Sequence, residues 1–412
     1  MVKDRLSVLY TSPVLRHPPV GGPYLRVENS IKALSEVCDL HIYARVSLGR
    51  LGGTDALAFY RRYCRDLALA PRPGIARRAA NLLARRALDR NVFDVDSRAV
   101  CRGLLRIAAG VGADIIWLGY GNISYPLLRY IKTHSTYRVV LDTDSVWSRY
   151  ILRKLPYARH ATERRAIANA GRRKEEEERE GTRLADVTTA VSEVDAEYYR
   201  RLAGDPDRVH IFSNVIDLHA YAEPPAPPDR LRRPALYLAG TFARGNPMDH
   251  AARWLIDTVL PRVRRELPDV HLYIAGVGSR SALADVRDPG TTVLGEVASV
   301  LPYLCHADAA LVPLHFESGT RFKILEAGAC GVPVVSTTLG AEGLAVRDGR
   351  HVLIAEQPDA FARGIVRLIR EPELARELAM NLEALVRAQH GIASLTREAT
   401  RVLHGAMVGA SR

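Results

Sequence analysis

The sequence has no long uninterrupted run of apolar residues. Its 412 residues are 47% hydrophobic and 25% charged, but no apolar run approaches the ~18 residues that a membrane-spanning helix needs. The first residues, MVKDRLSVLYTS, pass directly into a strand pattern, and we therefore expect no signal peptide. The composition disfavours an integral membrane protein and predicts a cytoplasmic globular protein with two or three domains.

Cysteine is scarce, and no two cysteines have the spacing of a metal or redox pair. The absence of a C-x-x-C motif and of a His/Cys cluster argues against a disulfide framework and a zinc site, so we expect reduced thiols. The five cysteines are Cys38, Cys64, Cys101, Cys305 and Cys330. We expect no metal or other cofactor.

Acidic residues are outnumbered by basic ones. The chain has 58 Lys and Arg against 46 Asp and Glu, a formal charge of +12. Two interpretations stay open: the arginine excess reflects genome composition, or it serves an anionic partner such as a lipid surface or a phosphorylated acceptor. Nucleic acid is not expected, because the sequence has no zinc-finger spacing, aromatic RNA-binding signature or basic tail.

The most informative stretch is Leu311–Leu344, which has the pattern of a strand, a loop, a helix and a second strand. An apolar run through Leu314 ends at the loop HFES, and helical spacing begins at Gly319. Gly331 ends the helix, and a second apolar run follows. Ser318 has the chemistry of an N-cap for this helix.

The start of this helix has the chemistry of an anion site. A helix start offers unpaired N–H groups and a partial positive charge, so Gly319, Thr320 and Arg321 can hold an anion. Lys323 and Glu326 lie on the same helix face as Gly319. Backbone donors and an ammonium suit a diphosphate, and a carboxylate suits the two hydroxyls of a ribose. From spacing alone, an ordinary surface pair is the alternative interpretation of Lys323 and Glu326.

The segment SGTRFKILEAGACGVPVVST, followed by GAEGL, resembles the donor-binding signature of family 4 of the GT-B glycosyltransferases, in the branch that reads GTRLKILEAMA-G-PVVST. The resemblance implies retaining transfer of a sugar from a nucleotide-diphosphate sugar, with catalytic and donor-binding roles for Lys323 and Glu326. Many members have two glutamates eight positions apart, but here Ser318 occupies the first of these positions. This departure leaves the donor sugar open, though not the nucleotide site. The sequence does not reveal the nucleotide base or the acceptor either.

The resemblance assigns donor or sugar contacts to four further positions. It implies that the glycine loop with Gly22 faces the donor phosphates, that Arg244 contacts the β-phosphate, and that backbone at Gly278 approaches the nucleotide. Asp144 stands where many members have a histidine or asparagine near the transferred sugar, and we include it among the catalytic candidates. The alternatives are ordinary turns for the glycines, an exposed loop arginine, and helix capping by Asp142 or Asp144.

Alternating strand and helix patterns predict an α/β fold. With the resemblance, this is a GT-B fold: two Rossmann-like, doubly wound parallel-sheet domains that face each other across a cleft. We expect an N-terminal acceptor-binding domain at residues 1–222, completed by the C-terminal helix at about 393–412. A proline-rich linker at 223–234 precedes the C-terminal nucleotide-sugar-binding domain at 235–392.

The predicted function is a retaining glycosyltransferase of cell-surface polysaccharide, glycolipid or natural-product glycoside biosynthesis, with a hydroxyl acceptor. Two alternatives stay open: a sugar-nucleotide 2-epimerase of the same fold, and a non-catalytic sugar-nucleotide-binding subunit, which the departure at Ser318 favours. No metal is expected at the diphosphate site. A cation held by the motif Asp142-x-Asp144 itself is a minor alternative. A dinucleotide oxidoreductase ranks last, because the first strand is not followed by G-x-G-x-x-G.

Two charged segments bear on partners and localisation. Residues 61–90 are arginine-dense and predicted to be helical, and Ile75–Leu88 has the pattern of a basic amphipathic helix at a membrane interface. A surface helix packed on the sheet is the alternative, so peripheral contact with the inner membrane face and a lipid-linked or anionic acceptor stay open, as does the oligomeric state. The run Glu175–Glu178 is predicted to lie on a solvated helix with no function.

Overall fold

The computed structural model describes residues 5–71, 98–318 and 322–408 of the chain. The predicted amphipathic helix at 75–88 lies outside these residues. So do the three predicted anion-binding residues, which are Gly319, Thr320 and Arg321.

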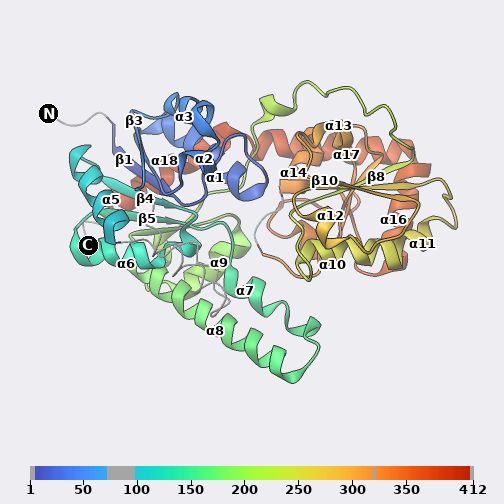
Figure 1. The fold of residues 1–412 in the computed structure, drawn as a ribbon, viewed down its shortest axis with the longest axis horizontal. Coiled ribbons are helices and arrows are strands. Elements are labelled where there is room, and N and C mark those ends of the chain that lie inside the picture. Colours follow the sequence, from blue (N-terminus) through green and yellow to red (C-terminus); the bar gives the residue numbers. More distant parts are fainter. Residues whose placement is uncertain (1–4, 72–97, 319–321, 409–412) are drawn as a thin grey trace. The chain divides into compact units, whose positions relative to one another are not determined.

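The chain divides into two compact units (Figure 1). The N-terminal domain is formed by Met1–Ser213 together with Leu395–Arg412, and the C-terminal domain is formed by Asn214–Ser394. The proline-rich segment 223–234 therefore lies inside the C-terminal domain. The chain passes between the two domains twice, because its end returns to the domain in which it began.

The N-terminal domain is built on a seven-stranded parallel sheet with the order β3-β2-β1-β4-β5-β6-β7. The interior strands are buried along almost their whole length, which is typical of a parallel sheet covered on both faces. The strands are β1 (Ser7–Ser12), β2 (Asp39–Ala44), β3 (Asp66–Leu69), β4 (Ile115–Gly119), β5 (Arg138–Asp142), β6 (Val187–Ala190) and β7 (Val209–Ile211).

Helices connect these strands in the right order for a doubly wound sheet. The last helix of the chain, α18, packs on this domain from Leu395 onward. The helices are α1 (Gly22–Val37), α2 (Leu48–Leu51), α3 (Gly53–Arg61), α5 (Arg98–Gly110), α6 (Tyr125–His134), α7 (Trp147–Leu152), α8 (Ala161–Leu184), α9 (Glu193–Leu202) and α18 (Ile392–Val408).

One prediction for this domain is wrong. Residues 61–90 were expected to be helical, but α3 ends at Arg61 and Asp66–Leu69 forms the edge strand β3. The backbone of β3 pairs in parallel with β2, from His41 opposite Asp66 onward. A four-residue strand is too short to show a period of its own, and the neighbouring arginines dominate the pattern.

The C-terminal domain has a six-stranded parallel sheet with the order β10-β9-β8-β11-β12-β13. Its strands are β8 (Ala235–Ala239), β9 (His271–Ala275), β10 (Thr291–Gly295), β11 (Ala309–Val312), β12 (Val334–Ser336) and β13 (Leu353–Ile354). Its α-helices are α10 (Pro247–Trp254), α11 (Leu260–Val263), α12 (Ser279–Ala282), α13 (Leu301–Leu304), α14 (Phe322–Ala329), α15 (Thr338–Ala341), α16 (Pro358–Arg370) and α17 (Pro372–Gln389), and the π-helical turn η5 (Leu255–Val259) joins α10 to α11.

The predicted α/β class with two doubly wound parallel sheets is confirmed. In each sheet the strand order reverses once, between β1 and β4 in the N-terminal domain and between β8 and β11 in the C-terminal domain. Loops at the carboxyl ends of the two strands beside such a reversal form the usual ligand site of an open α/β sheet. Among the described residues, no helix has both the length and the apolar character needed to cross a bilayer.

Candidate functional site

In the C-terminal domain, the loop after β8, which lies beside the reversal, packs backbone against backbone on the loop after the neighbouring strand β9. The loop after β8 contains Gly240 and Phe242, and the loop after β9 contains Gly276 and Gly278. Both latter glycines have positive φ angles, 130° and 76°. A Cβ atom at Gly276 would lie 1.8 Å from the oxygen of Gly240, and one at Gly278 would lie 2.2 Å from that of Phe242. These glycines therefore permit contact between two loops of the protein itself, which was not foreseen.

Arg244 lies at the tip of the β8 loop. Its side chain is 72% exposed, and its Nη2 lies 3.5 Å from an oxygen of Asp285. The backbone of the loop is anchored to α10, because the N–H of Gly245 donates a hydrogen bond of 2.8 Å to Asp249. Asp249 also accepts a hydrogen bond from Nε of Arg253. The position suits a cation that meets a ligand at the carboxyl end of the sheet, since the side chain is exposed and the loop that bears it is fixed.

The loop after β11 leads to α14, the helix of the predicted anion site. Its last described residue, Ser318, is 7% exposed. The preceding His315 and Phe316 anchor the loop: the His315 ring lies 5.2 Å from that of His250 and 4.8 Å from that of Trp254. Burial lowers the pKa of both histidines, which favours neutral rings at pH 7. Sequence reasoning missed this cluster, because its members come from separate elements.

Lys323 and Glu326 both lie on α14 and both are half-buried. Oε1 of Glu326 accepts a hydrogen bond of 3.1 Å from the hydroxyl of Tyr221, which lies in the short helix η4 (Leu218–Tyr221). Burial raises the pKa of Glu326, and the Tyr221 hydrogen bond and the Lys323 charge oppose the shift. Glu326 is thus a positioned carboxyl group and not an ordinary surface partner of Lys323.

The opposite face of α14 is fixed to the domain core. A Cβ atom at Gly328 would come within 2.8 Å of Val386 and 2.9 Å of Leu382, both on α17. This close packing explains the glycine in the sequence LEAGAC and holds the helix in one orientation. The direction in which Lys323 and Glu326 point is therefore set by the core.

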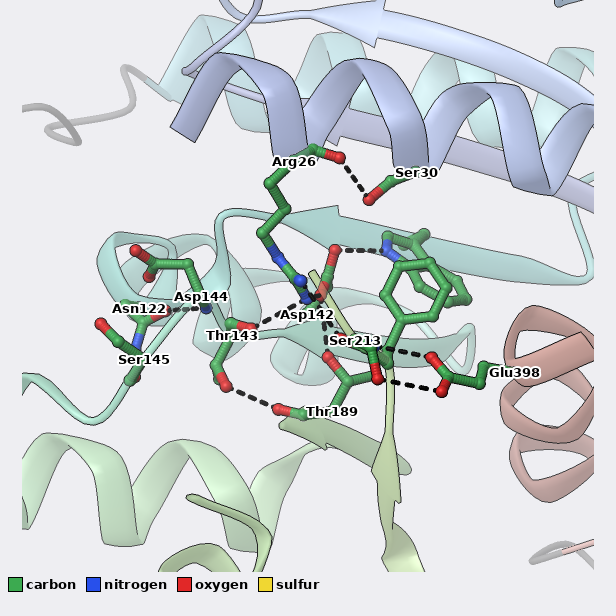
Figure 2. Close-up of polar contacts among 12 residues, drawn as sticks. Arg26, Ser30, Asn122, Asp142, Thr143, Asp144, Ser145, Thr189, Ser213 and Glu398 are labelled. Atoms are coloured by element: carbon green, nitrogen blue, oxygen red, sulfur yellow. Dashed lines mark hydrogen bonds and ion pairs between the residues drawn. The ribbon is translucent and has the colours of Figure 1, made fainter. Parts of the chain in front are cut away.

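In the N-terminal domain, Asp142 at the end of β5 is the centre of a buried polar cluster (Figure 2). Its Oδ1 lies 2.5 Å from Nη2 of Arg26 and accepts from Thr189 at 2.8 Å, and its Oδ2 accepts from Trp117 at 3.1 Å. Arg26 also donates to the oxygens of Thr143 and Phe212. The capping interpretation of Asp142 is wrong: α7 begins after Val146 without a side-chain cap.

Arg26 is a residue of this cluster that sequence reasoning missed. It lies on α1, one turn after Gly22, and its side chain is 2% exposed. Gly22 is the first residue of α1 and follows Gly21, whose φ angle is 114°. The available signal was an arginine one turn after a glycine-rich loop. Its partner could not be identified, because Asp142 is 116 residues away in the sequence.

Asp144 lies to one side of the Asp142 cluster, next to Asn122 (Figure 2). Its backbone N–H donates to Oδ1 of Asn122 at 2.9 Å, and its carboxylate accepts from Nε1 of Trp147 at 3.2 Å. Burial raises its pKa to about 7, and the charge of Arg26 opposes the shift. Asp144 is therefore a half-buried carboxyl group that changes charge near neutral pH, as groups at functional sites often do.

The Asp142-x-Asp144 pair does not form a cation site in the described structure. Both oxygens of Asp142 are already bonded to protein donors, while the Asp144 carboxyl group bonds to Trp147. Across the described residues, no group of three or more His, Cys, Asp or Glu side chains could hold a metal ion.

Part of the chain is similar in sequence to known proteins. Residues 233–371 match the family model described as "Glycosyl transferases group 1". D-inositol 3-phosphate glycosyltransferase of Mycolicibacterium gilvum is 32% identical over 180 residues, which cover 38% of this chain and 38% of that protein. The chain thus matches well under half of the length of this curated relative.

The similarity to solved structures extends over nearly the whole chain. Sucrose-phosphate synthase of Thermosynechococcus elongatus superposes with a TM-score of 0.67 at 16% identity, covering 99% of this chain and 100% of that one. The Anabaena protein HepE in complex with UDP and glucose gives a TM-score of 0.64 at 14% identity, covering 97% and 99%. At these identities the likeness shows the fold alone, which is GT-B.

Proposed function

We propose that this chain transfers a sugar from a nucleotide-diphosphate sugar to a hydroxyl acceptor, because residues 233–371 match the family model of the Glycosyl transferases group 1. One observation carries the proposal: Lys323 and Glu326 lie on a helix that follows β11 at the strand-order reversal of the C-terminal domain. Their cation and positioned carboxylate match the two polar parts of a nucleoside diphosphate.

The donor is held by charge and by hydrogen bonds. Lys323 and Arg244 neutralise the diphosphate. Gly278 keeps the neighbouring loop close to the nucleotide. The free oxygen of Glu326 accepts the ribose hydroxyls, since Tyr221 occupies Oε1. As the bond to the leaving diphosphate breaks, the cations stabilise the developing negative charge, an effect worth several kcal/mol in enzymes of this kind.

The acceptor binds the N-terminal domain, and the sugar is transferred with retention of configuration. Asp144 is the residue we place beside the reacting sugar, because its pKa of about 7 lets it accept or release a proton near neutral pH. Gly22 supplies backbone next to the phosphates. We propose that no metal ion takes part.

A UDP-sugar is the first donor to test. The support comes from a structural neighbour, the Anabaena protein HepE, which was solved with UDP and glucose. Thermal shift against UDP-, GDP-, ADP- and TDP-sugars should single out one base, because a bound ligand raises apparent stability by mass action.

The decisive variant is Glu326→Ala, with Glu377→Ala on the exposed face of α17 as the matched control. Loss of charged hydrogen bonds to the ribose should weaken binding of the selected nucleotide by about 100-fold in calorimetry, while the control binds like the parent. Circular dichroism verifies that both variants fold. Equal affinities for parent and Glu326→Ala would remove the basis of the proposal.

Ser318 favours a second candidate function, a sugar-nucleotide-binding subunit without activity of its own. Its hydroxyl stands where the resembled family has a carboxylate against the donor sugar, and it is almost fully buried. Hydrolysis of the selected donor without an acceptor separates the two functions: slow release of free sugar indicates a transferase. NMR of that sugar also reports whether the anomeric configuration is retained.

A further inference from the structure

A helical hairpin projects from the N-terminal domain (Figure 1). It consists of α7, the short helix η2 (Leu155–Tyr157) and the first half of α8. We refer to residues 149–173 as the α7–α8 arm. The second half of α8 packs on the domain through Glu178, Gly181 and Thr182, all buried, whereas residues 161–166 are exposed.

The arm has a strong excess of basic residues. It has eight Arg or Lys residues and one Glu, a formal charge of +7, within a chain whose total is +12. The basic residues are Arg149, Arg153, Lys154, Arg159, Arg164, Arg165, Arg172 and Arg173. Arg164 and Arg165 lie near the start of α8, where the helix dipole favours acidic residues. Helix stability therefore does not explain them.

Apolar and aromatic side chains lie among these charges at the tip of the arm, which is the part around η2. Tyr157 is 41% exposed, and Leu155 next to it is half-buried. Lys154 lies with its Nζ 4.0 Å from the centre of the Tyr150 ring. An exposed tyrosine with leucine and flanking arginines is the composition of segments that lie at a lipid–water interface.

The base of the arm is rigid. Glu178 was predicted to be solvated, but it is fully buried and bridges three helices: it accepts from Ser148 on α7 at 2.5 Å and from Tyr198 on α9 at 2.8 Å. A Cβ atom at Gly171 would lie 2.4 Å from a Leu152 methyl group, so α7 and α8 are in close contact. The tip is consequently presented in a fixed orientation.

We propose that the α7–α8 arm docks the protein on an anionic lipid bilayer. The charge attracts acidic head groups, and the exposed tip inserts at the head-group level. Nucleic acid fits less well, because phosphate contacts would leave Tyr157 and Leu155 without an apolar partner. The proposal is independent of glycosyl transfer.

The test is co-sedimentation of the full chain with phosphatidylcholine vesicles, with and without phosphatidylglycerol. We expect binding only to the anionic vesicles, and release by added salt because salt screens the charges. The double variant Arg164→Glu/Arg165→Glu should bind at least about tenfold more weakly. Tyr157→Ser should weaken vesicle binding less than the double variant does, and added salt should not change the size of this effect.

The matched control is Arg265→Glu/Arg363→Glu, which changes the formal charge equally at exposed sites of the C-terminal domain. It should bind like the parent, and thermal unfolding should show that all variants are folded. The proposal is overturned if the parent ignores anionic vesicles, if the arm variant still binds, or if the control loses equally. Binding of a DNA duplex by the arm in place of vesicles would overturn it as well.

Discussion

At the scale of single residues, the Arg26–Asp142 pair shows what a sequence cannot reveal. The two side chains are 2% and 1% exposed and lie 116 residues apart in the chain. Neither has a local pattern that identifies its partner, and Asp142 resembled a helix cap. The position of Lys323 and Glu326 on one face of α14 could be predicted from the sequence, because helical spacing alone determines it.

Arg26→Met should destabilise the protein strongly. It leaves the buried Asp142 carboxylate without its cation, and breaking such a pair typically costs about 3–5 kcal/mol. Urea unfolding at pH 7 measures the change, with the exposed Arg265→Met as the control. A loss below ~1 kcal/mol would show that Trp117 and Thr189 suffice to hold the carboxylate.

Asp144 should make stability depend on pH. Burial raises its pKa from 3.8 to about 7, so the folded state binds the proton more tightly than the unfolded state does. Its contribution is therefore fully present at low pH and is lost as the pH rises through 7. Asp144→Asn should remove this loss, so that the variant gains stability relative to the parent at pH 8 compared with pH 5. A pH-independent difference in unfolding free energy would contradict the assignment.

At the scale of elements, most strands could be predicted because buried parallel strands are continuous apolar runs. The exceptions have physical reasons. The edge strand β3 is short and only partly buried, and Glu178 lies in a run of four glutamates in which nothing marks the buried one. Burial is a property of the packed elements, so a charge run does not specify it.

The contact between the β8 and β9 loops should be sensitive to a single methyl group. Gly276→Ala places a Cβ 1.8 Å from the Gly240 oxygen, whereas the control Gly349→Ala, also at positive φ, meets nothing within 4 Å. The control should lose about 1 kcal/mol from backbone strain, and Gly276→Ala several kcal/mol more. Thermal unfolding of the two variants gives the comparison; equal losses would mean that the loops separate easily.

At the scale of the whole molecule, α18 completes the N-terminal domain. Glu398 on this helix accepts hydrogen bonds from the backbone and side chain of Ser213, at 2.7 and 2.9 Å. The apolar face of α18 is buried and includes Leu395, Val402 and Leu403. Only the last residues of the chain supply these contacts, although the sheet they support comes from its beginning.

Truncation after Gly391 should therefore destabilise the N-terminal domain by more than about 4 kcal/mol, since several core side chains lose their partners. Limited proteolysis with mass spectrometry should show early cleavage within residues 5–213 while the C-terminal domain stays resistant. Truncation after Val408 is the control and should leave the pattern unchanged. Equal protease resistance of both truncated chains would contradict the role of α18.

The discontinuous N-terminal domain determines the order in which the two domains are completed during translation. Residues 214–394 are contiguous, so the second domain has all of its parts as soon as they emerge from the ribosome. The first domain is translated earlier but cannot be completed until α18 has also emerged from the ribosome. Domains generally fold as units in the order of synthesis, and here the domain translated second is the first to be complete.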